Sequence, residues 1–162
     1  MRRGEHRVAA GFLQAVILLL GLGALVFLLW EPHLEGRNAN ATVWQVYFHD
    51  PFLAYACIAS LSFFGALYQG FRVLGQIRQG RVITPVAVAR LQSLKRCALA
   101  MIGFALGGEV FLFLGSFGES DDRAGGVAMG GLIILAALVM AAAASVSERV
   151  VRDAIEGVAV SS

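Results

Sequence analysis

The stretch AAGFLQAVILLLGLGALVFLLW, from Ala9 to Trp30, decides the fold of this chain. It carries no charged side chain, and its length is close to the ~20 residues with which a helix crosses ~30 Å of hydrocarbon. A basic start before an apolar core also occurs in cleavable signal peptides. This core is too long for a signal peptide, and no small-x-small cleavage site stands at its end, just before Trp30 and Pro32. We therefore predict a retained membrane-spanning helix.

Three further apolar stretches of similar length follow, from Phe52 to Leu74, from Cys97 to Phe117 and from Gly126 to Ser145. Because lipid offers no hydrogen-bond partner to a bare peptide group, segments of this length span a membrane as helices. The chain is 58% hydrophobic and 15% charged, whereas soluble domains carry about 25% charged residues. The short connectors leave little chain for a soluble domain. We predict an all-α membrane protein, a single four-transmembrane-helix bundle over residues 1–162.

The Lys and Arg residues are distributed unevenly between the connectors. Eleven of the thirteen lie in the two ends of the chain and in or beside the second connector, with Arg72 two residues before the second stretch ends, and only Arg37 and Arg123 lie in the first and third connectors. Positively charged loops stay in the cytoplasm, so this asymmetry predicts an N-in, C-in protein of the bacterial inner membrane. Anionic headgroups of the lipid bilayer account for the basic residues, and no nucleic-acid partner is expected.

The second connector and the end of the chain predict two amphipathic helical segments. Thr84-Pro85 is typical of a helix start, and Ala87 and Leu91 then recur on one face. We expect the third span to begin there as an amphipathic helix lying at the inner membrane surface. Beyond Ser145 the helical spacing continues, with pairs such as Glu148 and Arg152 four residues apart. The basic residues of both segments are candidates for binding a membrane or cytoplasmic protein partner: Arg78, Arg81, Arg90, Lys95, Arg96, Arg149 and Arg152.

Small residues mark candidate contacts between spans. Gly103 and Gly107 form a GxxxG pair in the third span, and Gly126 and Gly130 form another at the start of the fourth. Such residues let helix backbones approach closely in lipid. They predict close packing of the third span on the fourth, and the same motifs are also compatible with a homo-oligomer.

Glu109 is the one acid well inside a predicted span. A carboxylate is costly at that depth, so we expect an uncharged carboxyl group hydrogen-bonded to the second span, with Tyr55, Ser60 and Ser62 as candidate partners. The alternative is a functional carboxyl that handles protons or cations. The absence of a second intramembrane acid and of an internal repeat favours the structural interpretation.

The segment from Phe63 to Met101 resembles the central signature of a bacterial domain-of-unknown-function family of small four-helix integral membrane proteins. In the family an aromatic-rich helix end is followed by a Leu-x-x-Ile step, a Gly, a Phe-Ser or Phe-Thr pair and a Leu-rich basic run. The matching positions here are Leu74, Ile77, Gly80, Ile83, Thr84, Leu91, Leu94 and Lys95, with Ile83 in place of the usual Phe. The last span also passes into a similar charged stretch around Glu148, Arg149, Ile155 and Glu156.

The resemblance implies no catalytic residue, because the family has no established activity. Some members are encoded beside a small helix-turn-helix regulator, which suggests a regulatory role. The sequence also lacks the spacing motifs of metal, nucleotide and acyl-transfer sites, so we predict no enzyme activity and no cofactor. We favour a regulatory or protein-interaction module that acts through its cytoplasmic connector and tail. The alternative is a small oligomeric permease or ion-conducting protein that uses Glu109.

Overall fold

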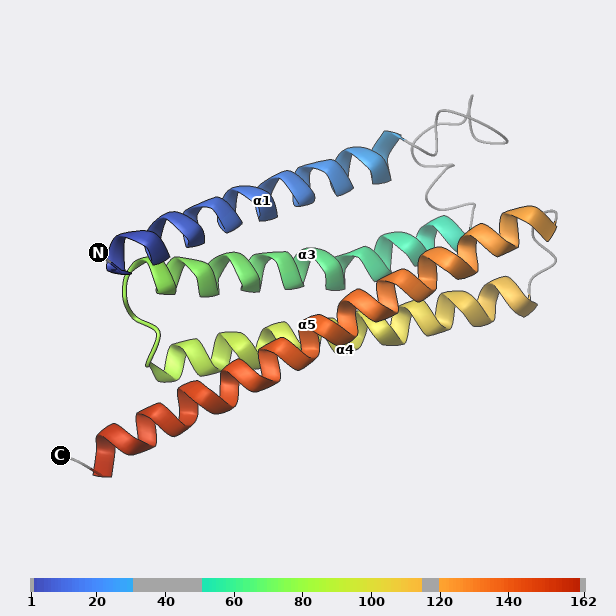
Figure 1. Ribbon diagram of the computed structural model, residues 1–162. Helices are drawn as coiled ribbons and strands as arrows, with labels where there is room; N and C mark the ends of the chain where they lie inside the picture. The colour runs from blue at the N-terminus through green and yellow to red at the C-terminus, as the bar shows by residue number, and fades with distance from the viewer. Residues whose placement is uncertain (1, 31–50, 115–119, 161–162) are drawn as a thin grey trace.

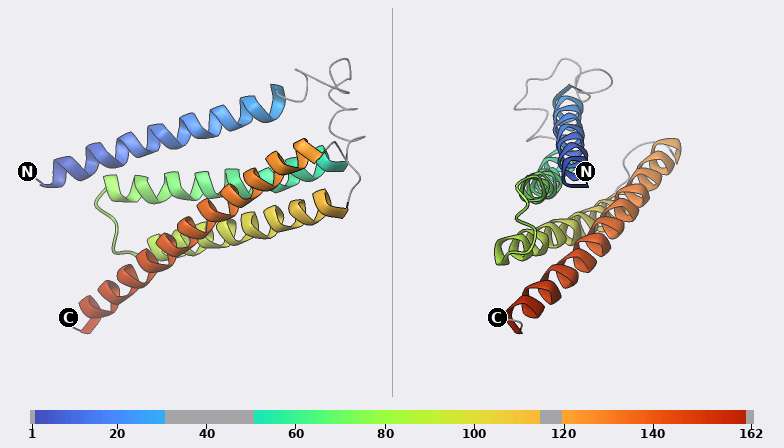
Figure 2. Two further views of the ribbon diagram at one scale, coloured as in Figure 1. Left: turned by 45° about the vertical axis from the view of Figure 1, so that its right-hand side comes forward. Right: turned by 60° about the vertical axis from the view of Figure 1, so that its left-hand side comes forward.

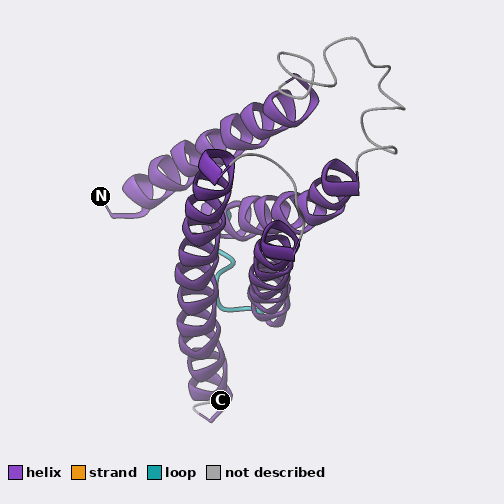
Figure 3. Ribbon diagram, turned by 90° about the vertical axis from the view of Figure 1, so that its right-hand side faces the viewer, coloured by secondary structure: helices purple, strands orange, loops and turns teal. Residues whose placement is uncertain are grey.

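The computed structural model describes residues 2–30, 51–114 and 120–160, with side chains from residues 7–30, 54–114 and 125–160. Four helices make up this part of the chain, which contains no strand (Figures 1 and 3). They are α1 (Arg2–Trp30), α3 (Pro51–Arg78), α4 (Pro85–Leu114) and α5 (Ser120–Val160). All four are long and apolar enough to cross a membrane. The predicted fold class is confirmed.

Each helix extends beyond its apolar stretch, chiefly at one end of the molecule. α3 continues past Leu74 to Arg78, α4 begins at Pro85 rather than Cys97, and α5 continues past Ser145 to Val160. Phe117, the predicted end of the third span, lies outside the described residues. α5 has 41 residues and is therefore ~60 Å long at ~1.5 Å per residue, about twice the ~30 Å of hydrocarbon. We use the name basic end for the end of the bundle that holds the start of α1, the α3–α4 connector and the end of α5 (Figure 1).

Three of the helices share a core, and α1 joins that group from one side (Figure 2). Ala66 of α3, Met101 of α4 and Ala137 of α5 form a buried cluster, surrounded by partly buried side chains such as Phe63 and Met140. α1 packs on α3, where Gly21 faces Leu67 and Gly70 faces Ile17. Most large apolar side chains of α1 are exposed, as expected for a helix that faces lipid.

Small residues let α5 approach α4 closely. A Cβ at Gly126 would lie 2.8 Å from Leu112 Cδ1, and a Cβ at Gly130 would collide with the Glu109 side chain. Further along α5, Ala137 and Ala144 are buried at 0% and 2% exposure. The predicted packing of the third span on the fourth is confirmed at Gly126 and Gly130.

The GxxxG pair of α4 does not take part in that contact as predicted. A Cβ at Gly107 would collide with the Tyr55 hydroxyl of α3, and a Cβ at Gly103 would meet nothing within 4 Å. Gly107 therefore packs against α3 rather than α5, and the prediction of a close contact at Gly103 is wrong. The reason is that α4 lies between two neighbours, so small residues on it can face either helix or neither.

Candidate functional site

The connector between α3 and α4 is held in one conformation by capping interactions. Gly80 has a φ of 70°, its amide donates to the Ile77 carbonyl at 3.1 Å, and the Arg81 amide donates to the Gln76 carbonyl at 3.0 Å. This pair of bonds is the Schellman arrangement that ends helices at glycine. Four residues later, Thr84 Oγ1 accepts a bond from the Ala87 amide at 3.2 Å. The predicted helix start at Thr84-Pro85 is confirmed.

The start of α4 lies against the end of α5 through a small apolar cluster. Ala87, Leu91 and Val151 are 3%, 6% and 7% exposed, and Val73 of α3 and Ile155 of α5 pack beside them. Residues 85–114 form one uninterrupted helix. The prediction of an amphipathic segment lying on the membrane surface is therefore wrong, because its apolar face is covered by α5 and α3 rather than by lipid.

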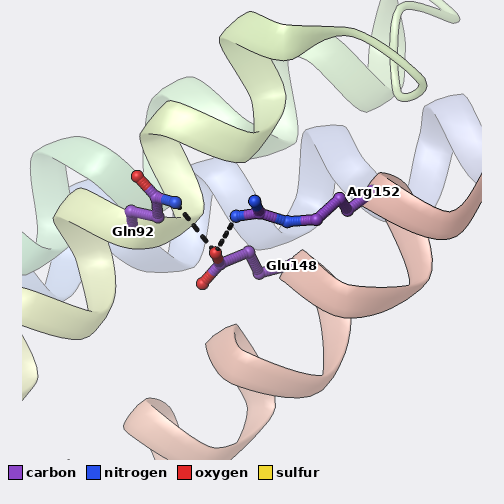
Figure 4. A network of polar contacts seen from close by, with 3 residues as sticks. All are labelled: Gln92, Glu148 and Arg152. Atoms are coloured by element: carbon purple, nitrogen blue, oxygen red, sulfur yellow. Dashed lines mark hydrogen bonds and ion pairs between the residues drawn. The ribbon is translucent and has the colours of Figure 1, made fainter. Parts of the chain in front are cut away.

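A polar network joins the same two helices next to that cluster (Figure 4). Gln92 Nε2 of α4 donates to Glu148 Oε1 at 2.9 Å, and Arg152 Nη2 of α5 donates to the same oxygen at 2.6 Å. Glu148 lies beyond the predicted span of 126–145. The bond from Gln92, followed by that from Arg152, lowers the pKa of the Glu148 carboxyl. The predicted i,i+4 pair is confirmed, and the tail of α5 is fixed to α4 by both apolar and polar contacts.

The predicted interaction residues fall into two groups at the basic end. Arg90, Lys95, Arg96, Arg149 and Arg152 belong to α4 and α5, and Arg90 Nη1 donates to Gln69 Oε1 of α3 at 3.2 Å. Arg78 and Arg81 lie at the other side, next to α1. The candidate residues therefore do not form one continuous patch.

Arg78 and Arg81 line a cavity of about 880 Å³ between α1, α3 and the connector. Arg7 and Arg72 also line it, and we call the cavity bounded by these four residues the arginine pocket. Gln14, on the α1 side, is buried at 6% exposure. Its Nε2 donates to the Phe71 carbonyl at 3.1 Å, and its Oε1 accepts a bond from Arg78 Nη1 at 2.8 Å.

Sequence reasoning missed the arginine pocket although a signal was present. Gln14 is the single side chain in the stretch Ala9–Trp30 that can form strong hydrogen bonds, apart from Trp30 at its end. A polar residue in a span usually faces a protein partner. That partner proves to be Arg78, and finding it required knowing that α1 packs on α3.

Glu109 lies between α4 and α5, and the structure corrects its predicted partners. The Tyr55 hydroxyl donates to the Phe104 carbonyl at 2.6 Å, and Ser60 and Ser62 donate to carbonyls of their own helix. The Glu109 side chain instead contacts the Gly130 position of α5, and its Oε2 is buried without a hydrogen-bond partner among the described residues. The prediction that Glu109 bonds to the second span is wrong, because the side chain faces the fourth span.

No group of three His, Cys, Asp or Glu side chains that could hold a metal ion occurs in the described part of the chain.

Comparison with known proteins places the chain in a family. An uncharacterized membrane protein of Bacillus subtilis (strain 168), YoaS, is 28% identical over 153 residues, which cover 93% of this chain and 94% of the relative. No solved structure matches the chain. Residues 35–158 match the model of a protein family of unknown function, DUF2975, which confirms the resemblance to such a family. This multi-pass membrane protein therefore belongs to the DUF2975 family.

Proposed function

We propose that this protein is a noncatalytic inner-membrane module whose basic end faces the cytoplasm and binds a partner protein. The observation that supports this role is the fixed position of the α5 tail. Outside the predicted span, Val151 packs in the apolar cluster with Leu91, and Glu148 bonds to Gln92. A tail that only ended a membrane helix would need neither contact.

The surface of this unit indicates the chemistry of the partner. Arg96 and Arg149 are exposed, and neither forms an ion pair with another described side chain. Val146 and Val150 are also exposed on the α5 tail, at 63% and 62%. Basic and apolar side chains together suit an acidic, partly apolar protein segment. The excess of Lys and Arg at this end supports its cytoplasmic location.

Site-specific photo-crosslinking in native membranes tests the proposal. A photoreactive residue at Val150 should form a crosslink to a protein, whereas one at Val139 should crosslink lipid. The two positions are a matched pair, because they are 62% and 63% exposed and lie 11 residues, or about three helical turns, apart on one face. The mass of the product separates a different protein from a second copy of this chain. Lipid products alone at both positions would contradict the proposal.

Charge reversal provides the second arm of this experiment. Arg149→Glu should reduce the crosslinking yield from Val150, since an acidic partner segment would be repelled. Arg7→Glu, on the far side of the basic end, should leave that yield unchanged.

Glu109 supports a second candidate function, a small permease or ion-conducting oligomer. Its Oε2 is buried without a partner among the described residues, and intramembrane acids often mark ion or proton pathways. Flux measurements in proteoliposomes separate the two functions. In an interaction module, Glu109→Gln changes no flux and keeps crosslinking at Val150. A cation or proton flux that disappears in Glu109→Gln, with stability retained, would establish the second function.

A further inference from the structure

We propose that the arginine pocket is a binding site for a phosphate group, supplied by the headgroup of an anionic phospholipid or by a soluble phosphate. This inference does not depend on the proposed protein partner, because the pocket lies between α1, α3 and the connector, away from the α5 tail.

The charge of the pocket indicates an anionic ligand. Arg7, Arg72, Arg78 and Arg81 come from three different parts of the chain and line one cavity. No described lining residue is acidic, and the one ion pair between described side chains is that of Glu148 and Arg152. The four arginines therefore line the cavity without a described carboxylate to neutralise their charge. Arginine binds phosphate through paired N–H donors, which makes such a cluster suited to this ligand.

Two contacts position two of the four arginines, Arg78 and Arg72. Arg78 Nη1 is bonded to Gln14 Oε1, and this bond uses one of the five N–H donors of a guanidinium group. Arg72 lies over the Tyr68 ring, with Cζ 5.8 Å from the ring centroid. A site whose charged groups are positioned before binding loses less entropy when the ligand arrives.

The neutral part of the lining also suits a polar ligand. Gln76 lines the pocket and has a buried Oε1 without a hydrogen-bond partner among the described residues. Buried amide oxygens normally accept a bond, so this atom is available to a hydroxyl group beside the phosphate. Phosphatidylglycerol carries such hydroxyl groups in its headgroup.

The depth of the pocket matches the headgroup layer. About 20 residues cross the hydrocarbon, so a span that ends at Trp30 begins close to Gly11, and Arg7 lies just outside it. Arg78 lies four residues beyond Leu74, the predicted end of the second span. Phe71 and Val86 also line the cavity and give it an apolar side. Basic pockets between membrane helices at this depth bind phospholipid headgroups in other proteins.

The test compares two double variants that remove the same charge. Arg7→Gln with Arg81→Gln changes two pocket residues, and neither side chain forms a hydrogen bond or ion pair with another described residue. Arg96→Gln with Arg149→Gln changes two exposed residues outside the pocket. Native mass spectrometry of the protein in neutral detergent would measure binding of phosphatidylglycerol. Phosphatidylcholine is the zwitterionic reference, because its choline group neutralises its own phosphate.

We expect one phosphatidylglycerol to bind in preference to phosphatidylcholine, and the pocket variant to bind it about 30-fold more weakly, as expected for two lost arginine contacts at a membrane surface. The variant with Arg96→Gln and Arg149→Gln should bind phosphatidylglycerol with an affinity within about threefold of that of the unmodified protein. Arg7→Lys with Arg81→Lys should give an intermediate affinity, because lysine keeps the charge and lacks the paired donors. An intermediate affinity in this lysine variant would show that the loss in the glutamine variant reflects weaker binding and not misfolding.

A parallel arm identifies the source of the phosphate. Inorganic phosphate that raises the melting temperature of lipid-free protein, with the effect lost in the pocket variant, would assign the site to a soluble ligand. Binding of phosphatidylglycerol without such a shift would assign it to lipid. The proposal would be overturned if both double variants bound phosphatidylglycerol equally weakly. It would also be overturned if the unmodified protein showed neither a preference for phosphatidylglycerol over phosphatidylcholine nor a rise in melting temperature with inorganic phosphate.

Discussion

The α4–α5 contact and the α1–α3 contact join neighbouring helices by different means. Along α5, Gly130, Ala137 and Ala144 bring its backbone close to its neighbours, and Ala137 is completely buried. Among the described side chains of α1, the one that is both polar and buried is Gln14, which bonds to α3 near the basic end. The first contact relies on small residues along much of α5, and its polar bond from Gln92 to Glu148 lies beyond the predicted span. The second contact has fewer close approaches, at Gly21 and Gly70, and adds a polar clamp, by which we mean the bonds of Gln14 to Phe71 and Arg78.

This difference predicts which helices should stay together when a substitution weakens the bundle. In lipid no hydrophobic effect drives helices together, so close packing and hydrogen bonds carry the association. α3, α4 and α5 share a core and should act as one unit. α1 is attached to that unit and should separate from it more readily.

Enlarging the centre of the core should give the largest effect. Ala137 is 0% exposed between three helices, so Ala137→Leu should destabilise the fold by about 1–3 kcal/mol through overpacking. The neighbouring Ala136 is exposed, and Ala136→Leu should change stability by less than about 0.5 kcal/mol. Unfolding measured in the same detergent would compare them. Equal effects of the two substitutions would place the core elsewhere on α5.

Removing the polar clamp should loosen α1 alone. Gln14→Leu loses the bonds to the Phe71 carbonyl and to Arg78, which together stabilise by about 1 kcal/mol at the usual strength of hydrogen bonds between membrane helices. Hydrogen exchange should become faster near the start of α1 and stay unchanged in α4 and α5, which serve as the internal control. Faster exchange throughout the bundle would show that α1 belongs to the core.

The two glycines of α4 should respond differently to the same small change. Gly107→Ala pushes a methyl group into the Tyr55 hydroxyl and disturbs its bond to the Phe104 carbonyl, at a cost of about 1 kcal/mol. Gly103→Ala meets open space and should leave stability unchanged or slightly raised. Thermal unfolding of both variants would check this. A larger loss at Gly103 would reverse the assignment of these faces.

The sequence predicted the helices well because the length of an apolar stretch depends on the chain alone. It predicted Gly126 and Gly130 correctly for a similar reason, since α5 packs chiefly on one neighbour. It failed at Gly103 and at Glu109 because α4 contacts both α3 and α5. Which neighbour a residue of α4 faces depends on the rotation of that helix, and this rotation is set by the packing of all three helices together.

The sequence could indicate that Gln14 has a protein partner, but it could not show that the arginines of the pocket lie together. Arg7 is far from the other two arginines in the sequence, and the turn at Gly80 separates Arg72 from Arg81. The preference of basic residues for the cytoplasmic side explains each of them alone. Their convergence becomes visible only when α1 is placed beside α3.

Acidification should give the smallest effect, at the end of α5. The pKa of Glu148 is lowered in the fold by its bonds from Gln92 and Arg152 and by the nearby charge of Lys95. A carboxyl whose folded pKa is lowered stabilises the fold above its ordinary pKa, and this contribution disappears as the pH falls through the folded value. Hydrogen exchange of residues 148–160 should therefore become faster relative to the core between neutral pH and pH values below about 4, after correction for the intrinsic pH dependence of exchange. Glu148→Gln cannot be protonated in this way and should remove the added pH dependence. An equal pH response in Glu148→Gln would show that another group fastens the tail to α4.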